Sequence, residues 1–324
     1  MKKKYKFLKD KSVTITKYWH YNLTSNKKNN FIFKDLLKKI VRFFLNKFGL
    51  SIFKSNFLLR IEQRSYTSSY KILKIRNENV CIFLTSYFSN FGINFKKKSL
   101  IQFIKNYQII FCAYQKNNID LNGGMGFNNG LILFCILSYL NPKVIIESGI
   151  WRGFTTKLID KATSNDSKIL CFDINLSRNK YKSKKATYYE RDITEISKIN
   201  FQNVDLALFD DHVSHYDRIN FCLLNKIKAV ILDDDVGLTQ VHSDGWPPIP
   251  TASMIYNYND TPKKFTWVSN NQMALANISG LKVNNIIDYY NYIPFPCLNK
   301  FTGYKNSSFT TLLLSRSILK QKKY

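Results

Sequence analysis

The sequence lacks the features that mark several common classes of protein. No run of 18 apolar residues free of charge occurs in the 324-residue chain, which argues against a membrane-spanning helix. The basic start, MKKKYKFLKD, is not followed by an uninterrupted apolar stretch, so we expect a cytoplasmic protein without a secretory signal peptide. We find neither an internal repeat nor a low-complexity linker.

Paired cysteines are also missing. The six cysteines are scattered along the chain and form no C-x-x-C pair. Most of them stand in apolar surroundings, such as LFCILSYL and KILCFDI. This spacing predicts neither a disulfide framework nor a thiolate metal site, but free and mostly buried thiols in a reducing compartment.

Acidic residues are scarce. Asp and Glu number 22 against 49 Lys and Arg, so the formal net charge is +27. Residues 1–120 hold 25 basic and 5 acidic residues, a net charge of +20, and the remainder of the chain carries the other +7. Such a field attracts polyanions, whether nucleic acid, an anionic membrane surface or acidic glycans. A compositional drift toward Lys, Asn, Ile, Phe and Tyr explains the excess equally well.

The chain divides into two regions at about residue 118. Residues 1–118 are basic and aromatic, and we expect a partly helical extension or small domain there. Within it, residues 33–54 predict a basic amphipathic helix that ends near Gly49. Packing of this helix on its own domain is the favoured interpretation. Peripheral contact with an anionic membrane surface, at the inner face of the membrane, is the alternative.

Residues 119–324 alternate between apolar strands and helices. Strands are expected at 143–148, 168–174, 185–192, 204–211 and 228–235, with helices between them. A hairpin at 264–279 that turns at 270–271 and a last strand at 308–316 follow. Apolar strands that alternate with helices indicate a parallel sheet covered on both faces, so we expect a doubly wound, Rossmann-like α/β fold.

Polar residues follow the predicted strands at the edge where an open parallel sheet binds its ligand. They are Glu147, Gly149 and Gly153 after the first strand, Asp173 after the second, Asp192 after the third, Asp210, Asp211, His212 and His215 after the fourth, and Asp233, Asp234 and Asp235 after the fifth. Taken singly, each has a structural explanation, because small residues serve packing and a strand-end acid often caps a helix. Their joint order along the sheet favours a binding site.

The chemistry of these residues limits the ligand. Glu147 beside a glycine turn disfavours phosphate and favours a group that is cationic or bears hydroxyls. Gly149 lets the backbone turn, and Gly153 lets a ligand approach closely. A carboxylate at Asp173 can accept hydrogen bonds from both hydroxyls of a ribose. Carboxylates that converge at neighbouring strand ends repel one another unless they are protonated or bind a hard cation such as Mg²⁺.

On these residues the chain resembles the Rossmann-like, class I S-adenosylmethionine-dependent methyltransferases over residues 119–324. It is most similar to the metal-dependent branch with sugar O-methyltransferases and cephalosporin hydroxylase-like proteins. The resemblance implies a mostly parallel, seven-stranded sheet with a final antiparallel hairpin strand. It places Glu147, Gly149 and Gly153 at the methionine part of the cofactor, Asp173 at the ribose and Asp192 at the adenine. Asp210, Asp233 and Asp234 would hold Mg²⁺.

The chain departs from that branch after the fourth strand. D-G-D-H is common there, whereas this sequence has Asp210-Asp211-His212. The departure therefore leaves the identity of the general base open by one residue position. His212 is the first choice, followed by Asp211 and His215. A segment with His242 and Trp246 follows the fifth strand and is either a substrate-facing loop or a structural connection.

The resemblance implies an S-adenosylmethionine-dependent O-methyltransferase, assisted by Mg²⁺, that acts on a hydroxyl of a sugar, a glycan or a small molecule. A nucleic-acid methyltransferase is an alternative that fits the basic first third, but no Asn/Asp-Pro-Pro-aromatic motif follows the fourth strand. A non-catalytic binding module is the other alternative. An NAD-dependent dehydrogenase is disfavoured, because no G-x-G-x-x-G follows the first strand.

Overall fold

The computed structural model describes most of the chain beyond residue 75. The described residues are 76–116, 125–196, 199–238, 240–241, 247–269, 272–304 and 308–321. The predicted helix at 33–54, the predicted turn at 270–271, and His242 and Trp246 lie outside the described residues.

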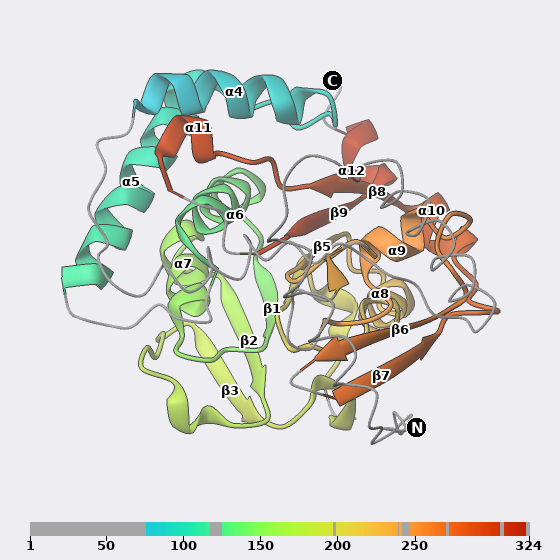
Figure 1. Ribbon diagram of the computed structural model, residues 1–324. Coiled ribbons are helices and arrows are strands. Elements are labelled where there is room, and N and C mark those ends of the chain that lie inside the picture. Colours follow the sequence, from blue (N-terminus) through green and yellow to red (C-terminus); the bar gives the residue numbers. More distant parts are fainter. Residues whose placement is uncertain are drawn as a thin grey trace, which may run out of the picture.

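One central sheet contains seven strands in the order β3-β2-β1-β4-β5-β9-β8 (Figure 1). β1 to β5 are parallel, and β9 runs antiparallel between β5 and β8. The bounds are β1 Val144–Ser148, β2 Lys168–Asp173, β3 Ala186–Glu190, β4 Leu206–Phe209, β5 Ala229–Leu232, β8 Tyr290–Pro294 and β9 Thr311–Ser315. The predicted Rossmann-like sheet is confirmed, and its strand order reverses beside β1, which places the ligand crevice at the carboxyl ends of β1 and β4.

The two faces of the sheet belong to two hydrophobic clusters. Ile145 of β1 and Ile231 of β5 join the cluster that contains helices α4 to α7. Their neighbours Ile146 and Val230 join the cluster that contains α8 to α10 on the other face. Because successive side chains of a strand point to opposite faces, continuous apolar strands such as VII and AVIL are buried on both sides, as a doubly wound fold requires.

The described helices lie on both faces and beside the antiparallel edge of the sheet (Figure 1). Their bounds are α4 Asn77–Ser89, α5 Lys97–Lys116, α6 Phe127–Leu140, α7 Phe154–Ala162, α8 His215–Leu224, α9 Ala252–Tyr256, α10 Asn284–Tyr289, α11 Asn299–Thr302 and α12 Arg316–Gln321. Helices α6, α7 and α8 confirm the helices predicted beside the first and fourth strands.

Helices α4 and α5 pack against the rest of the fold. α4 contacts α5, and α5 contacts α6. Leu84 of α4 and Ile104 of α5 are fully buried in the same cluster as Ile145 of β1. Residues 77–116 therefore share a core with the sheet. The division of the chain into a basic region 1–118 and a methyltransferase domain 119–324 stays a prediction.

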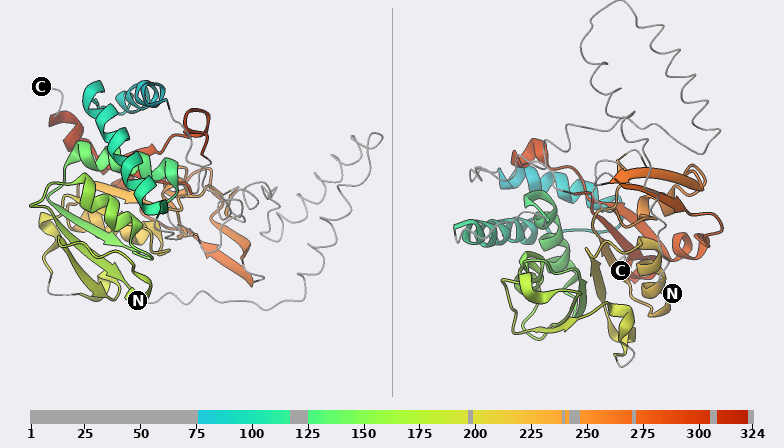
Figure 2. Two further views of the ribbon diagram at one scale, coloured as in Figure 1. Left: turned by 90° about the vertical axis from the view of Figure 1, so that its left-hand side faces the viewer. Right: turned by 60° about the horizontal axis from the view of Figure 1, so that its bottom comes forward.

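The antiparallel part differs in detail from the expectation. The predicted hairpin forms strands β6 Lys264–Ser269 and β7 Gln272–Asn277, but these make a separate two-stranded sheet that stands off the main one (Figure 2). The seventh strand of the main sheet is instead β8, which the sequence analysis missed. Its residues, YNYIP, show no apolar-polar alternation, and Pro294 is tolerated because β8 is an edge strand.

The described residues also bear on the predictions about membrane-spanning helices and cysteines. None of the described helices is both long and apolar enough to span a membrane. All six cysteines are free, and Cys81, Cys135, Cys171 and Cys222 are buried, as their apolar surroundings predict.

Candidate functional site at the carboxyl edge of the sheet

The turn after β1 lies directly against the end of β4. The Gly149 N–H donates to the carbonyl of Phe172, and the Asp210 N–H donates to the carbonyl of Ser148. Gly149 has a φ of 88°, and a Cβ there would lie 2.1 Å from the carbonyl oxygen of Asp210. Only glycine permits this backbone conformation and this close approach together. The turn therefore brings Glu147 and Asp210 to the same edge.

Asp173 is placed where the sequence predicts, at the end of β2 and facing the Gly149 turn. One carboxylate oxygen accepts hydrogen bonds from the backbone N–H groups of Ile150 (2.8 Å) and Trp151 (3.2 Å). The other accepts from Asn175 N–H at 2.8 Å. A carboxylate has about four lone-pair positions, so Asp173 anchors the turn and keeps capacity for one ligand hydroxyl.

Gly153 lies where the turn after β1 meets α7. It caps α7 with a φ of 81°. A Cβ there would lie 2.5 Å from Oδ1 of Asn179 and 3.1 Å from Cβ of Tyr181. The loop after β2 thus lies close against Gly153, and the approach of a ligand to this glycine stays a prediction.

Glu147 is fully buried beneath α7. Its Oε2 accepts a weak hydrogen bond from the thiol of Cys171 at 3.5 Å. Its Oε1 has no partner of good hydrogen-bond geometry among the described residues, although the hydroxyl of Thr156 lies near enough to lower the pKa of the carboxyl. Burial raises the pKa of Glu147 to about 8. An orphaned carboxylate oxygen next to a glycine turn fits a cationic or hydrogen-donating ligand, because such a partner would offset the cost of desolvation.

A buried arginine that the sequence analysis missed links two predicted site residues. Arg218 of α8 donates to Asp192 after β3 at 2.5 Å and to Asp211 after β4 at 2.7–2.9 Å. Asp211 also accepts from Ser148 Oγ at 2.5 Å. Arg218 could have been found from its position, since it lies on the buried face of α8 with His215 and Cys222.

This network uses the hydrogen-bonding capacity of both carboxylates. Burial opposes ionisation of Asp192, but hydrogen bonds from Arg218 and Thr194 outweigh it and hold the pKa at about 2. Asp211 is paired with Arg218 and also accepts from the N–H of Val213. Asp211 is therefore poorly suited to accept a proton, and Asp192 supports the site while its contact with adenine stays a prediction.

His215 and Asp233 are built into the core. The His215 Nε2 lies 2.9 Å from the Asp233 carbonyl, and its Nδ1 accepts from the Ala252 N–H at 3.1 Å. The Asp233 carboxylate accepts from the hydroxyls of Ser308 (2.8 Å) and Thr310. Both ring nitrogens of His215 are thus engaged with the backbone, and Asp233 is turned toward β9. Both residues thus make structural contacts, and the base role of His215 and the cation-ligand role of Asp233 stay predictions.

Asp210, His212 and Asp234 do come together. One donor atom from each lies within 4.8 Å of the others. Nδ1 of His212 is 3.4 Å from a carboxylate oxygen of Asp234, and the His212 side chain is 53% exposed. His212 and Asp234 have φ values of 55° and 57°, which are uncommon outside glycine. Burial, and then the carboxylates of Asp233 and Asp234, raise the pKa of Asp210 well above its usual range.

This donor set can hold a divalent cation. Two carboxylates suit Mg²⁺ or Mn²⁺, and the imidazole nitrogen adds a donor that transition metals accept more readily than Mg²⁺. A cation would also offset the repulsion that raises the pKa of Asp210. Asp210 and Asp234 of the predicted set thus meet His212, while Asp233, the third predicted ligand, lies near enough to raise the pKa of Asp210.

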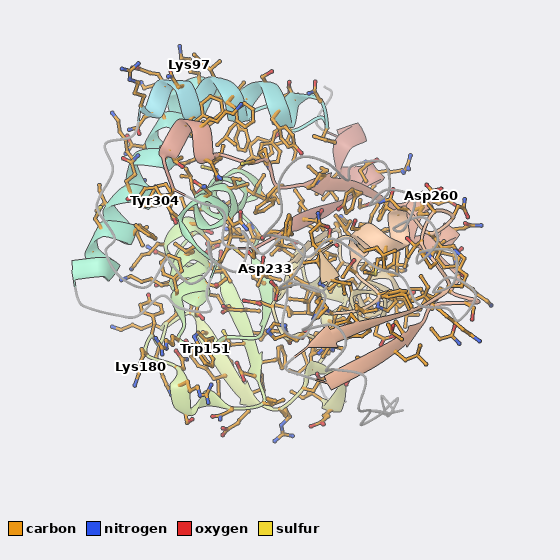
Figure 3. The ribbon with its side chains drawn as sticks, viewed as in Figure 1. Lys97, Trp151, Lys180, Asp233, Asp260 and Tyr304 are labelled. Atoms are coloured by element: carbon orange, nitrogen blue, oxygen red, sulfur yellow. The ribbon has the colours of Figure 1, made fainter. Side chains whose placement is uncertain are left out.

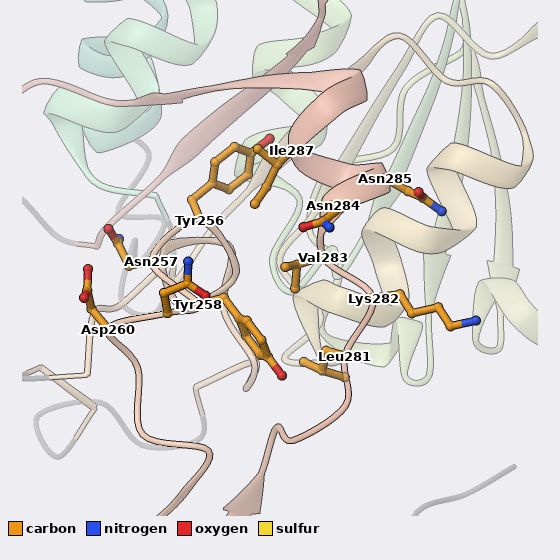
Figure 4. A pocket seen from close by; sticks show the side chains of 11 residues that line it. Tyr256, Asn257, Tyr258, Asp260, Leu281, Lys282, Val283, Asn284, Asn285 and Ile287 are labelled. Carbon is orange, nitrogen blue, oxygen red and sulfur yellow. The ribbon is translucent and has the colours of Figure 1, made fainter.

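A separate cavity lies away from these residues. It has a volume of about 580 Å³ and lies between the segment after α9 and the segment that leads into α10 (Figure 4). None of the predicted site residues lines it. In the overall view, Asp260 of this cavity lies well to the right of Asp233, and Trp151 of the glycine turn lies below and to the left (Figure 3).

The sheet order and the strand-end residues define a Rossmann-like protein with its candidate site at the carboxyl edge. No family model and no curated protein matches the sequence. Solved structures do match. The O-methyltransferase TomG from Streptomyces achromogenes, in complex with SAM, is 12% identical, with a TM-score of 0.37 over 74% of this chain and 98% of that one.

Two further structures illustrate the range of the matches. An O-methyltransferase from Bacillus cereus in complex with SAH is 10% identical, with a TM-score of 0.37 over 72% of this chain and 97% of that one. A structure described as cmcI-D160 Mg-SAM is 14% identical, with a TM-score of 0.34 over 59% and 72% of the two chains. These proteins are of the kind that the resemblance predicts, but at such identities and TM-scores we draw no argument about activity from the likeness.

Proposed function

We propose that this chain is an S-adenosylmethionine-dependent O-methyltransferase that acts on a hydroxyl of a sugar, a glycan or a small molecule, with a bound divalent cation. The observation that carries the proposal is the meeting of Asp210, His212 and Asp234 within 4.8 Å, directly against the Gly149 turn. This arrangement sets a candidate base and two cation ligands beside a turn suited to a cationic ligand.

The residues around the turn suit the cofactor. S-adenosylmethionine carries a sulfonium and an ammonium group, and the buried carboxylate of Glu147 has an oxygen without a partner of good hydrogen-bond geometry at that turn. Asp173 holds the turn and retains acceptor capacity for a ribose hydroxyl. Asp192 follows β3, is held in place by Arg218, and would contact the adenine. Such a preformed site would hold the methyl group for in-line transfer.

Asp210 and Asp234 would hold the cation, with Mg²⁺ as the first candidate. A cation there would supply Lewis acidity that lowers the pKa of the acceptor hydroxyl. Asp233, which accepts hydrogen bonds from the hydroxyls of Ser308 and Thr310 just before β9, supports this site. The strained backbone at Asp234 fits a residue that is held in place for a ligand.

His212 would accept the proton of the acceptor hydroxyl. Its side chain is half-exposed, and the carboxylate of Asp234, 3.4 Å from Nδ1, would orient its ring. An imidazole is a side chain that can take up a proton at neutral pH. Asp211 and His215, the other candidates for the base, are already engaged with Arg218 and with the backbone.

Calorimetric titration of S-adenosylhomocysteine into the purified chain, with and without Mg²⁺, tests this function. We expect micromolar binding that Asp173→Ala weakens by about tenfold or more, since two backbone anchors of the turn and a ligand acceptor are lost. Asp166→Ala is the matched control, because that carboxylate is exposed and its ion pair is with exposed Lys143. Absence of binding by the wild type under both conditions would overturn the proposal.

A further inference from the structure

The glycine turn carries a cationic and aromatic surface that the proposed chemistry does not use. Trp151, the central residue of the turn, is 37% exposed. The guanidinium of Arg178 lies 4.6 Å from the centroid of its ring, and that of Arg152 lies 5.5 Å from it. Lys180 is tied to the same place, since its N–H donates to the Arg152 carbonyl. We call Trp151, Arg152, Arg178 and Lys180 the basic rim.

The loop that supplies this rim is basic throughout. Residues 174–185, INLSRNKYKSKK, contain five lysines and arginines and no acidic residue. Lys185 pairs with Asp160, and Lys182 lies over the ring of Tyr188. In the described part of the chain, no carboxylate lies within ion-pair distance of Arg178 or Lys180. Arg178 and Lys180 therefore give the rim two positive charges that no carboxylate of the described residues pairs with.

The cofactor does not account for this charge. S-adenosylmethionine has two positive groups and one carboxylate, so a cationic surface beside its site repels it overall. Because the turn around Trp151 is anchored on Asp173, the rim borders the proposed cofactor site. Figure 3 shows Trp151 and Lys180 on the same side of the molecule. A positively charged surface at that place attracts a second, anionic ligand.

We propose that the basic rim binds a phosphate or diphosphate group of the methyl acceptor. Guanidinium groups present paired N–H donors that match phosphate oxygens, and Lys180 adds a point charge beside them. The indole of Trp151 holds Arg178 and so limits the entropy lost when a phosphate binds. The acceptor is thus a phosphorylated small molecule whose hydroxyl reaches the Asp210 cluster. This inference rests on the proposed O-methyltransferase function.

The test measures binding of inorganic pyrophosphate and of a uridine diphosphate sugar, by calorimetry without divalent cations. Indole fluorescence is a second readout, because a ligand that moves Arg178 changes the surroundings of Trp151, and Trp151→Phe identifies that signal among the four tryptophans. The double variant Arg178→Gln/Lys180→Gln removes two charges from the rim. Lys98→Gln/Lys105→Gln removes two charges from the exposed face of α5 and is the matched control.

We expect the rim variant to weaken binding of both probes by about tenfold or more, because each charge-assisted hydrogen bond lost contributes about that factor. The α5 variant should weaken it less than about twofold, since distant exposed charges are screened. A preference for the sugar nucleotide over pyrophosphate identifies a nucleotide-linked acceptor. Equal affinity identifies the phosphate group alone as the feature recognised.

Three results would overturn the inference: no binding of either probe, equal weakening by both double variants, or tight binding of a single-stranded oligonucleotide without binding of the small probes. The last would make nucleic acid the partner. S-adenosylhomocysteine is titrated in parallel into the rim variant and the wild type. If the wild type does not bind S-adenosylhomocysteine, the proposed function is wrong. If it binds S-adenosylhomocysteine but neither phosphate probe, only the inference about the basic rim is wrong.

Discussion

The guanidinium of Arg218 donates to the carboxylate of Asp192 at 2.5 Å, with the arginine side chain only 2% exposed. The same guanidinium reaches Asp211 and stacks over the ring of Phe209, its centre 5.5 Å from the centroid. Through Ser148, which donates to Asp211, the network ties the ends of β1, β3 and β4 together. A single arginine of α8 thus fixes the loops that surround the candidate site.

Removal of Arg218 should destabilise the protein strongly. Arg218→Met keeps much of the volume but leaves two carboxylates without their partner, and breaking a buried pair in this way costs about 3–5 kcal/mol. Lys143→Met is the control, because the ion pair of Lys143 with Asp166 is exposed and should contribute less than about 1 kcal/mol. Urea denaturation measures both. Similar losses in the two variants would show that the buried network is not what holds these loops.

The fold was predictable from the sequence because its signals are local. Apolar runs of four to six residues alternate with amphipathic helices, and that pattern gave β1 to β5, α6, α7 and α8 within a few residues of their observed bounds. Strand β8 escaped prediction because its aromatic residues show no alternation, and its place in the sheet depends on pairing with β9.

For the site, the sequence predicted which residues lie at strand ends but not the directions in which their side chains point. Sequence order placed Asp173 and Asp210 at strand ends, but which of three consecutive acids after β5 faces the crevice depends on backbone torsion. Asp234, with a φ of 57°, turns toward His212, and Asp233 turns toward Thr310. The charge of Asp192 is paired by Arg218, a side chain of α8 that lies 26 residues further along the chain. No local sequence pattern reveals that pairing.

Glu147 should make stability depend on pH. Its pKa in the folded protein is about 8, raised by burial from an ordinary value of 4.5. Between these values the folded state holds a proton that the unfolded state has released, so the free energy of unfolding falls as pH rises, by up to about 1.4 kcal/mol per pH unit. Glu147→Gln removes this titration.

Denaturation of the wild type and Glu147→Gln at pH 5 and pH 9 gives the measurement. The variant should gain stability relative to the wild type at pH 9, where the wild-type carboxylate is ionised in the core. If the difference between the two proteins is the same at both pH values, Glu147 is not a buried titrating group.

A comparison of Gly149→Ala with Gly280→Ala tests the close contact between the turn after β1 and the end of β4. Both have positive φ, 88° and 76°, but a Cβ at Gly149 overlaps the Asp210 carbonyl, whereas a Cβ at Gly280 meets nothing within 4 Å. Gly280→Ala should cost about 1–2 kcal/mol from its backbone conformation alone. Gly149→Ala should cost roughly 1–3 kcal/mol more, because the turn and the end of β4 must separate. Equal losses by denaturation would contradict the close approach.

His212 and His215 lie three positions apart in the sequence and should differ completely in what they do. His212→Asn keeps a residue that tolerates positive φ, so stability should change by no more than about 0.5 kcal/mol. Because the variant lacks the general base, its kcat should be about 10²–10⁴-fold lower, and the corresponding limb of the pH profile should disappear. Its affinity for the cation should be unchanged.

His215→Ala should do the reverse. It leaves the buried Ala252 N–H without an acceptor, opens a cavity beside Asp233, and should lower the free energy of unfolding by about 2 kcal/mol or more. Calorimetric titration of Mn²⁺ into His212→Asn separates the two roles open to His212. Weakened Mn²⁺ binding would make His212 a cation ligand through the nitrogen that faces Asp234, and the proton of the acceptor would then need another base at this edge.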